Sequence, residues 1–133
     1  ISDGYGNTGS GKLSAFYLGR LYFDRGEFEL AETYMTNYVK NPEVKMLTAT
    51  AYSILAKLAE FDEDYSSAIA HSKNAVKTCT IDSDRNHHSL SLASLYILDD
   101  ESSEAFEILD VIIKKTNPND PIRAKAERLK GQL

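Results

Sequence analysis

Apolar and small residues recur along the chain at steps of three and four, in stretches that short polar breaks separate. This spacing places one apolar stripe along an α-helix. The breaks lie at 24–27, 61–64 and 99–102, and another stretch of the same kind follows each of them. A pair of amphipathic helices joined by a tight turn is expected at each break. The pattern therefore predicts an all-α chain built from three helical hairpins.

The hairpins repeat at an interval of 37 residues, the spacing from Ala31 to Ala68 and from Ala68 to Ala105. These alanines lie in the second helix of each hairpin. The first helices carry small residues at another matched position, which is occupied by Gly19, Ala56 and Ala93. Small side chains let two helices approach closely, and a larger side chain there would force them apart.

Glycine and proline mark expected helix ends. Gly26 lies in the first polar break and is suited to the positive φ that ends many helices. Pro42 and Pro118 follow the second helices of the first and third hairpins, where a proline prevents the helix from continuing. We expect these second helices to end before the prolines.

The last part of the chain predicts a seventh helix. Asp120 is suited to cap its first turn, and Pro121 is a favoured first helical residue. A narrow apolar stripe follows, made of Ile122, Ala126 and Leu129. Because stacked repeats need an end piece with a polar outer face, we expect this helix to cover the third hairpin.

These residues resemble the tetratricopeptide repeat family. Its pattern pairs Leu-Gly with a later Tyr in the first helix, and an aromatic residue with Ala at the entry to the second. The first repeat carries this pattern as Leu18, Gly19, Tyr22, Gly26, Phe28 and Ala31. The later repeats depart from it, because Ala56 and Ala93 replace the glycine and Ser102 replaces the aromatic residue. The interval also exceeds the family's usual length of about 34 residues.

The resemblance implies a right-handed helical-hairpin solenoid of three repeats. They are expected at about 10–42, 46–79 and 86–118. A lead-in loop at 1–9 precedes them, and a C-terminal capping helix at 119–133 follows them. In this reading the aromatic residues Tyr22, Phe28, Tyr65 and Tyr96 belong to the core by their spacing.

Composition and charge narrow the possible partners. The chain has 133 residues, of which 42% are hydrophobic and 26% are charged, as expected for one globular domain. Its net charge is -5 and it contains no run of Lys or Arg, so its field opposes a nucleic-acid backbone. No apolar stretch approaches the about 18 residues that a membrane-spanning helix needs. We therefore expect no nucleic-acid partner and no direct membrane contact by this segment.

Gly6 to Lys12 comes close to the sequence of a phosphate-binding loop. Such a loop needs a Ser or Thr after the lysine to bind magnesium, and a preceding strand. Leu13 follows the lysine here, and the rest of the pattern is helical. We interpret the segment as the entry to the first repeat, with Thr8 or Ser10 capping the first helix.

Asp82 to Asn86 resembles the start of a calcium-binding loop. His87 stands where that loop needs glycine and Ala93 where it needs glutamate. Cys79, with the neighbouring His87 and His88, has no spacing diagnostic of a transition-metal site. We interpret the segment as a solvated loop before a helix and His71 as a surface histidine. The sequence predicts no catalytic residue, no cofactor and no metal.

The family resemblance implies a groove for a protein or peptide partner. In such a solenoid the first helices line the concave side, and their non-core positions contact the partner. Carried over position by position, these residues are Phe16, Arg20, Phe23, Ser53, Lys57, Glu60, His87, Leu90, Ser94 and Ile97. The capping helix, upstream repeats or a second copy of the chain are alternative occupants of the same positions.

The function expected from these observations is a non-enzymatic protein-interaction scaffold. Two alternatives remain: a self-assembly module that forms a homo-oligomer, and a nucleotide-binding protein that uses Gly6 to Lys12. Tyr5 to Thr8 resembles the lead-in of bacterial membrane-anchored tetratricopeptide proteins. That likeness implies a role in protein translocation or envelope assembly, on the periplasmic side of a membrane. The first residue is Ile1 rather than Met, so we expect upstream sequence.

Overall fold

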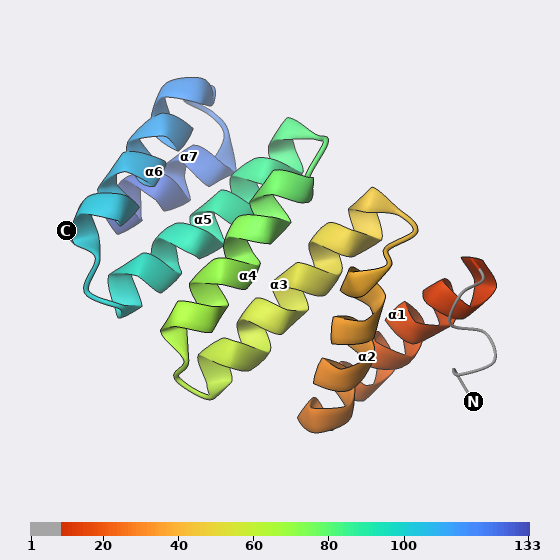
Figure 1. Ribbon diagram of the computed structural model, residues 1–133. Helices are drawn as coiled ribbons and strands as arrows, with labels where there is room; N and C mark the ends of the chain where they lie inside the picture. Colours follow the sequence, from red (N-terminus) through yellow and green to blue (C-terminus); the bar gives the residue numbers. More distant parts are fainter. Residues whose placement is uncertain (1–8) are drawn as a thin grey trace.

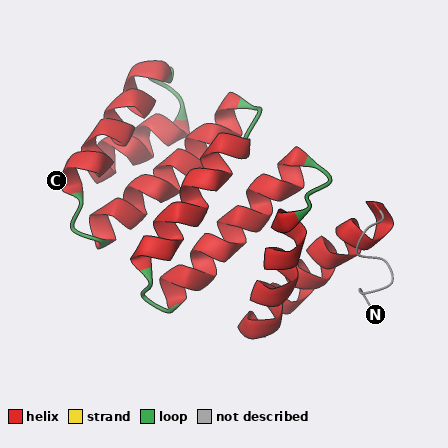
Figure 2. Ribbon diagram, viewed as in Figure 1, coloured by secondary structure: helices red, strands yellow, loops and turns green. Residues whose placement is uncertain are grey.

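The computed structural model describes residues 9–133, and these form seven α-helices joined by short loops (Figures 1 and 2). The helices are α1 (Gly9–Asp24), α2 (Phe28–Lys40), α3 (Lys45–Phe61), α4 (Tyr65–Thr78), α5 (Asp82–Leu98), α6 (Ser102–Lys115) and α7 (Pro121–Lys130). Each helix packs antiparallel against the next one along the chain. The protein is therefore all-α, as predicted, with an arrangement consistent with helical hairpin repeats.

The three hairpin turns share one backbone geometry at the 37-residue interval. A residue in the left-handed region ends α1, α3 and α5. These residues are Gly26 (φ 78°), Glu63 (φ 57°) and Asp100 (φ 58°). The next amide donates to a carbonyl five residues earlier, as Glu27 to Tyr22 (2.9 Å), Asp64 to Ala59 (2.9 Å) and Glu101 to Tyr96 (2.8 Å). This is a Schellman helix end. The positive φ expected at Gly26 is confirmed.

The small residues lie where the helices of a hairpin meet. Ala31, Ala68 and Ala105 have no exposed surface, and Ala93 is equally buried. At Gly19 a Cβ atom would lie 3.0 Å from the Met35 Cγ of α2, closer than an ordinary contact. The close approach predicted at Gly19 is confirmed, and the alanines at the matched positions are buried, as that role requires.

Two hydrophobic cores divide the molecule. Helices α1, α2 and α3 bury the first, which consists of Ala15, Phe16, Ala31, Met35, Tyr38, Ala51, Ile54, Leu55 and Leu58. Helices α4 to α7 bury the second, which consists of Ala68, Ile69, Leu92, Ala93, Leu95, Tyr96, Ala105, Leu109, Ile112, Ile122 and Ala126. We call them the N-terminal core and the C-terminal core.

The aromatic residues expected in the core do not all lie there. Tyr96 is buried, whereas Tyr22 and Tyr65 are half-buried. Phe28 is 42% exposed, so its assignment to the core is wrong. It is the first residue of α2, at the hairpin turn, where the neighbouring helices do not enclose its ring.

Helix ends follow the predicted signals in most places. α2 ends at Lys40 and α6 at Lys115, each before the expected proline. The segment from Asp82 is not a loop, contrary to the sequence prediction, because α5 begins there. Asp82 pairs with Arg85 within the first turn, where carboxylates are also stabilised by the helix dipole.

α7 is attached to α6 by its first residues and its last turn. The Asp120 carboxylate accepts a hydrogen bond from the Ile122 amide (3.0 Å), which confirms the predicted cap. Ile122 and Ala126 are buried in the C-terminal core. Lys130 Nζ lies 3.1 Å from the Asp110 carboxylate of α6, joining the two helices at the surface.

Part of the predicted lead-in lies outside the described residues. This applies to Tyr5 to Thr8 and to the first half of the phosphate-loop-like sequence. α1 already includes Gly9 and Ser10. Within residues 9–133, no helix combines the length and the apolar character that spanning a membrane requires.

Candidate protein-interaction surface

The predicted groove residues lie on α1, α3 and α5, and most of them reach the surface. Arg20, Lys57 and His87 are exposed. Six others are half-buried: Phe23, Ser53, Glu60, Leu90, Ser94 and Ile97. These nine side chains are at least partly accessible to a partner.

Phe16 is the exception, because only 2% of its surface is exposed. Its ring centroid lies 5.4 Å from that of Tyr38, inside the N-terminal core. Ala15 and Gly19 are buried on the same helix, so this face of α1 is turned toward its neighbours. Phe16 is a core residue, contrary to the prediction that it lines an open groove.

The two basic residues of the predicted groove, Arg20 and Lys57, form ion pairs within their own helices. Arg20 Nε lies 3.7 Å from Asp24 Oδ1, and Lys57 Nζ lies 3.9 Å from Glu60 Oε1. Exposed pairs at such distances contribute little to stability. These cations can therefore exchange their present contacts for a partner's at small cost.

Phe23 belongs to an aromatic cluster that joins the first two hairpins at their turns. Its ring lies parallel to that of Phe61, with centroids 6.5 Å apart. Phe28 completes the cluster, 5.1 Å from Phe61. Because Phe61 is 52% exposed and Phe28 is 42% exposed, the cluster forms an apolar patch on the surface. Phe61 was not among the predicted site residues, because it falls at a polar break.

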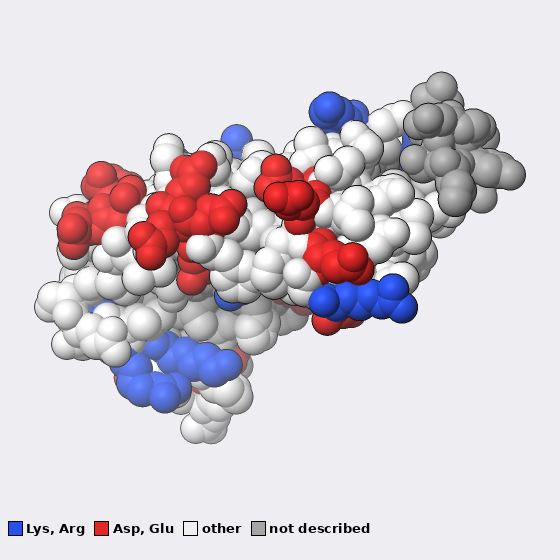
Figure 3. Space-filling model, turned by 90° about the horizontal axis from the view of Figure 1, so that it is seen from below, with Lys and Arg blue, Asp and Glu red and all other residues white. Residues whose placement is uncertain are grey.

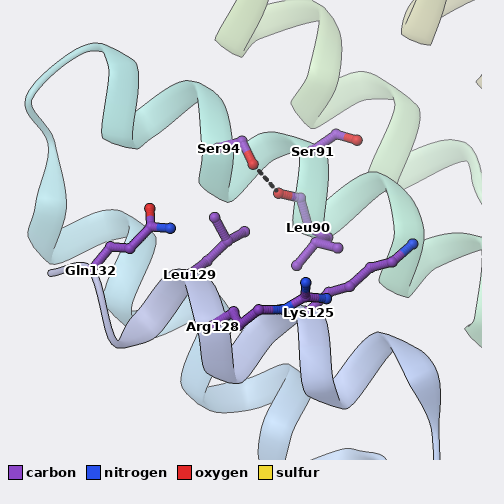
Figure 4. A pocket seen from close by; sticks show the side chains of 7 residues that line it. All are labelled: Leu90, Ser91, Ser94, Lys125, Arg128, Leu129 and Gln132. Atoms are coloured by element: carbon purple, nitrogen blue, oxygen red, sulfur yellow. Dashed lines mark hydrogen bonds between the residues drawn. The ribbon is translucent and has the colours of Figure 1, made fainter.

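A groove between α5 and α7 contains two of the predicted residues (Figure 4). It has a volume of about 380 Å³ and is lined by Leu90, Ser91, Ser94, Lys125, Arg128, Leu129 and Gln132. We call it the α5–α7 groove. The other wall comes from α7 and from Gln132, which follows it, rather than from α1 or α3. The sequence predicted that the last helix covers the third hairpin, but it did not predict that Lys125 and Arg128 would line a site together with Leu90 and Ser94 of α5.

Charge is unevenly distributed over the surface. The hairpin turns lie along one edge of the molecule and carry the acidic runs 62–64 and 99–101. Figure 3 views the molecule from this side and shows carboxylates spread over the face. One group of Lys and Arg side chains lies apart from them in the same view. A charged partner would therefore meet different fields on different parts of the surface.

A second cavity of about 240 Å³ lies where the α4–α5 loop meets α3, and Cys79, Asp84 and His88 contribute to its wall. Burial raises the pKa of the Cys79 thiol, which keeps the thiol protonated at neutral pH. Burial lowers the pKa of His88. No group of three or more His, Cys, Asp or Glu side chains within residues 9–133 is placed to hold a metal ion.

His71 lies in a third cavity, of about 160 Å³, that Glu32 and Asp64 also line. Its Nδ1 atom is buried and has no hydrogen-bond partner among the described residues. Burial lowers the pKa of this imidazole, and the charges of Glu32 and Asp64 partly oppose the shift. The prediction of a surface histidine is therefore wrong, because the ring is half-buried against Tyr52.

Lys12, the lysine of the phosphate-loop-like sequence, lies within α1. Its Nζ is 3.5 Å from Glu43 Oε2, and its side chain is largely covered. The lysine thus links α1 to the loop after α2. The preceding Gly6 to Thr8 lie outside the described residues.

Comparison with known proteins does not assign the chain to a family. No protein-family model matches it, and no curated protein is significantly similar to it.

Proposed function

We propose that this protein is a non-enzymatic protein-interaction scaffold that holds a peptide or partner helix against the exposed side of α1, α3 and α5. In this proposal the hairpins are three tetratricopeptide-type repeats in a right-handed solenoid, with α7 as the cap. The common 37-residue interval of the buried alanines and the Schellman turns supports this reading.

The α5–α7 groove is the observation that most favours the proposal. It is an open concave site with an apolar floor, and it includes Leu90 and Ser94, which were chosen from the sequence as contact residues. Its lining combines two leucines with five polar or charged side chains, which suits a peptide contact better than an apolar small molecule. Arg20 and Lys57 lie exposed on the preceding first helices and extend the proposed contact surface.

A pull-down from cell extract tests the proposal. The wild-type chain is compared with an Arg20→Glu/Lys57→Glu variant, and bound proteins are identified by mass spectrometry. The control is Lys40→Gln/Lys77→Gln, which removes two exposed cations of the second helices α2 and α4 without placing a carboxylate in their last turns. We expect a partner that the control retains and the Arg20→Glu/Lys57→Glu variant loses. Equal recovery by both variants would place the contact elsewhere, and recovery of no partner would contradict the scaffold function.

Self-assembly is a second candidate, and exposed apolar residues on the first hairpin favour it. Tyr17 and Leu21 are one turn apart on α1 and are 59% and 45% exposed. Leu30 on α2 is 42% exposed. A second copy could cover such residues. Light scattering over a range of concentrations distinguishes the candidates, since a mass that stays monomeric throughout would exclude this one.

A further inference from the structure

The basic residues of α7 divide into two groups. Arg123 is engaged by Glu127 (2.9 Å) and by the Thr116 carbonyl (3.0 Å), and Lys130 by Asp110 (3.1 Å). Lys125 and Arg128 are exposed and have no ion-pair partner within residues 9–133. Both of them line the α5–α7 groove. The groove therefore has two cations whose charge no carboxylate of the described chain neutralises.

The floor of the groove between these cations and α5 is apolar. Leu90 and Leu129 are half-buried, and both pack against the C-terminal core. Figure 4 shows them projecting into the space between α5 and α7, with the Lys125 and Arg128 side chains alongside. An apolar side chain placed here would lose its contact with water against Leu90 and Leu129.

The hydroxyl groups of the groove cannot supply donors in their present geometry. Ser94 donates to the Leu90 carbonyl (3.2 Å, dashed in Figure 4), and Ser91 donates to the His87 carbonyl (3.3 Å). Each hydroxyl has one hydrogen, so both can only accept from a ligand. The donors left for a ligand are the charged groups of Lys125 and Arg128 and the amide of Gln132. This donor set suits an anion.

We infer that the α5–α7 groove binds an acidic peptide segment, whose apolar side chain packs on Leu90 and Leu129 and whose neighbouring carboxylates pair with Lys125 and Arg128. This inference rests on the proposed scaffold function and specifies its partner. The Arg128 guanidinium can bind a carboxylate through two parallel hydrogen bonds, and Lys125 adds a mobile point charge. The acidic turns at 62–64 and 99–101 would repel the same segment from the edge that they occupy.

A nucleic acid fits these observations less well than an acidic peptide. Its affinity comes mainly from many phosphate contacts with Lys and Arg. The groove has two such residues in a chain of net charge -5. The floor of the groove is formed by Leu90 and Leu129, and a phosphate backbone has no apolar group to pack against them.

Fluorescence anisotropy with short labelled peptides tests the inference on the full chain. In one peptide a single leucine is flanked on both sides by glutamates, and in the matched peptide by lysines. We expect the glutamate peptide to bind, the lysine peptide not to bind, and the affinity to fall as salt rises. We further expect Lys125→Gln/Arg128→Gln to weaken binding by about tenfold or more, because it removes two charge-assisted contacts.

Neutral glutamines are chosen because Arg128 lies in the last turn of α7, where the helix dipole favours a cation and a carboxylate would disturb the helix. The matched control is Lys77→Gln/Lys115→Gln, which removes two exposed cations outside the groove. It should bind the glutamate peptide as the wild type does. Circular dichroism and thermal unfolding establish that each variant is folded. Amide shifts of Leu90, Ser94, Leu129 and Gln132 in an NMR titration locate the peptide.

The inference is overturned if both peptides bind equally, if neither binds, or if the groove and control variants have the same affinity. None of these results decides the scaffold function, which the pull-down tests through Arg20 and Lys57. A partner that the Arg20→Glu/Lys57→Glu variant loses and the Lys125→Gln/Arg128→Gln variant keeps would support the scaffold and refute the acidic-peptide site.

Discussion

The two cores of the molecule are built from the same kind of hairpin but from different side chains. The N-terminal core is centred on Phe16, Met35 and Tyr38, and other aromatic residues pack around it. The C-terminal core is mainly aliphatic, with Leu109 and Ile112 among its most buried residues. α7 contributes to the second core, whereas Tyr17 and Leu21 of α1 remain exposed beside the first.

The boundary between the cores does not coincide with a repeat boundary. α3 contributes to the N-terminal core and α4 to the C-terminal core, although they form one hairpin. The small residues set how closely neighbouring backbones approach. They recur at the same sequence positions in each hairpin. Large side chains then fill the remaining space in more than one way, provided that total volume is preserved. A sequence repeat and a packing unit are therefore different divisions of this chain.

The largest expected effects come from cavities in each core. Leu109→Ala and Met35→Ala each remove a side chain that has no exposed surface, so each should lower the free energy of unfolding by about 2 to 5 kcal/mol. Because the two residues belong to separate cores, the double variant should show the sum of both effects to within about 0.5 kcal/mol. Urea unfolding measures all three values. A larger interaction energy would show that the cores act as one unit.

Overpacking at the boundary between the cores should have the next largest effect. Ala68 lies in α4 with no exposed surface, so Ala68→Leu should lower the free energy of unfolding by about 1 to 3 kcal/mol. Ala70→Leu is the matched control, since Ala70 is exposed on the same helix, and it should change stability by less than about 0.5 kcal/mol. Equal thermal unfolding of the two variants would contradict the tight packing assigned to Ala68.

Substitutions in the hairpin turns should have smaller effects on stability. The turns share one backbone geometry, but the residue in the left-handed region differs from turn to turn. Gly26→Ala places a Cβ at φ 78° and should cost about 1 kcal/mol. Glu63→Gly and Asp100→Gly relieve the same strain and should each stabilise the fold by up to about 1 kcal/mol. Glu63→Gly should gain more, since Asp tolerates the left-handed region better than Glu. If thermal unfolding shows that Glu63→Gly and Asp100→Gly are both less stable than the wild type, this account is refuted.

The smallest effect should be the pH dependence that the half-buried histidines cause. Burial lowers the pKa of His71 and of His88 in the folded state. Between the lowered folded pKa and about pH 6.5 the unfolded chain therefore binds more protons, so stability should fall as pH falls through this range. His71→Gln should flatten the melting temperature as a function of pH between about 7.5 and 5.5. An unchanged slope would show that His71 does not contribute to it.

Most of the local structure could be predicted from the sequence. The hairpins, the turn at Gly26, and the start of the last helix at Asp120 follow from short-range signals: periodicity, backbone freedom and capping. The start of α5 was missed although a local signal was present, since Asp82 and Asp84 are suited to the first turn of a helix. In the candidate site, the sequence identified positions that are mostly accessible. Spacing alone could not show that one of them, Phe16, is buried in the core.

The sequence by itself thus determined most of the helix positions, because periodicity and capping depend on neighbours within about one or two helical turns. The repeat at 37 residues also identified the small residues. Tertiary structure decided the rest. It buried Phe16, left Phe28 exposed, divided the cores inside the second hairpin, and brought Leu90 of α5 beside Leu129 of α7. These outcomes depend on how much surface each helix covers on its neighbours, and the pattern within one helix does not contain that information.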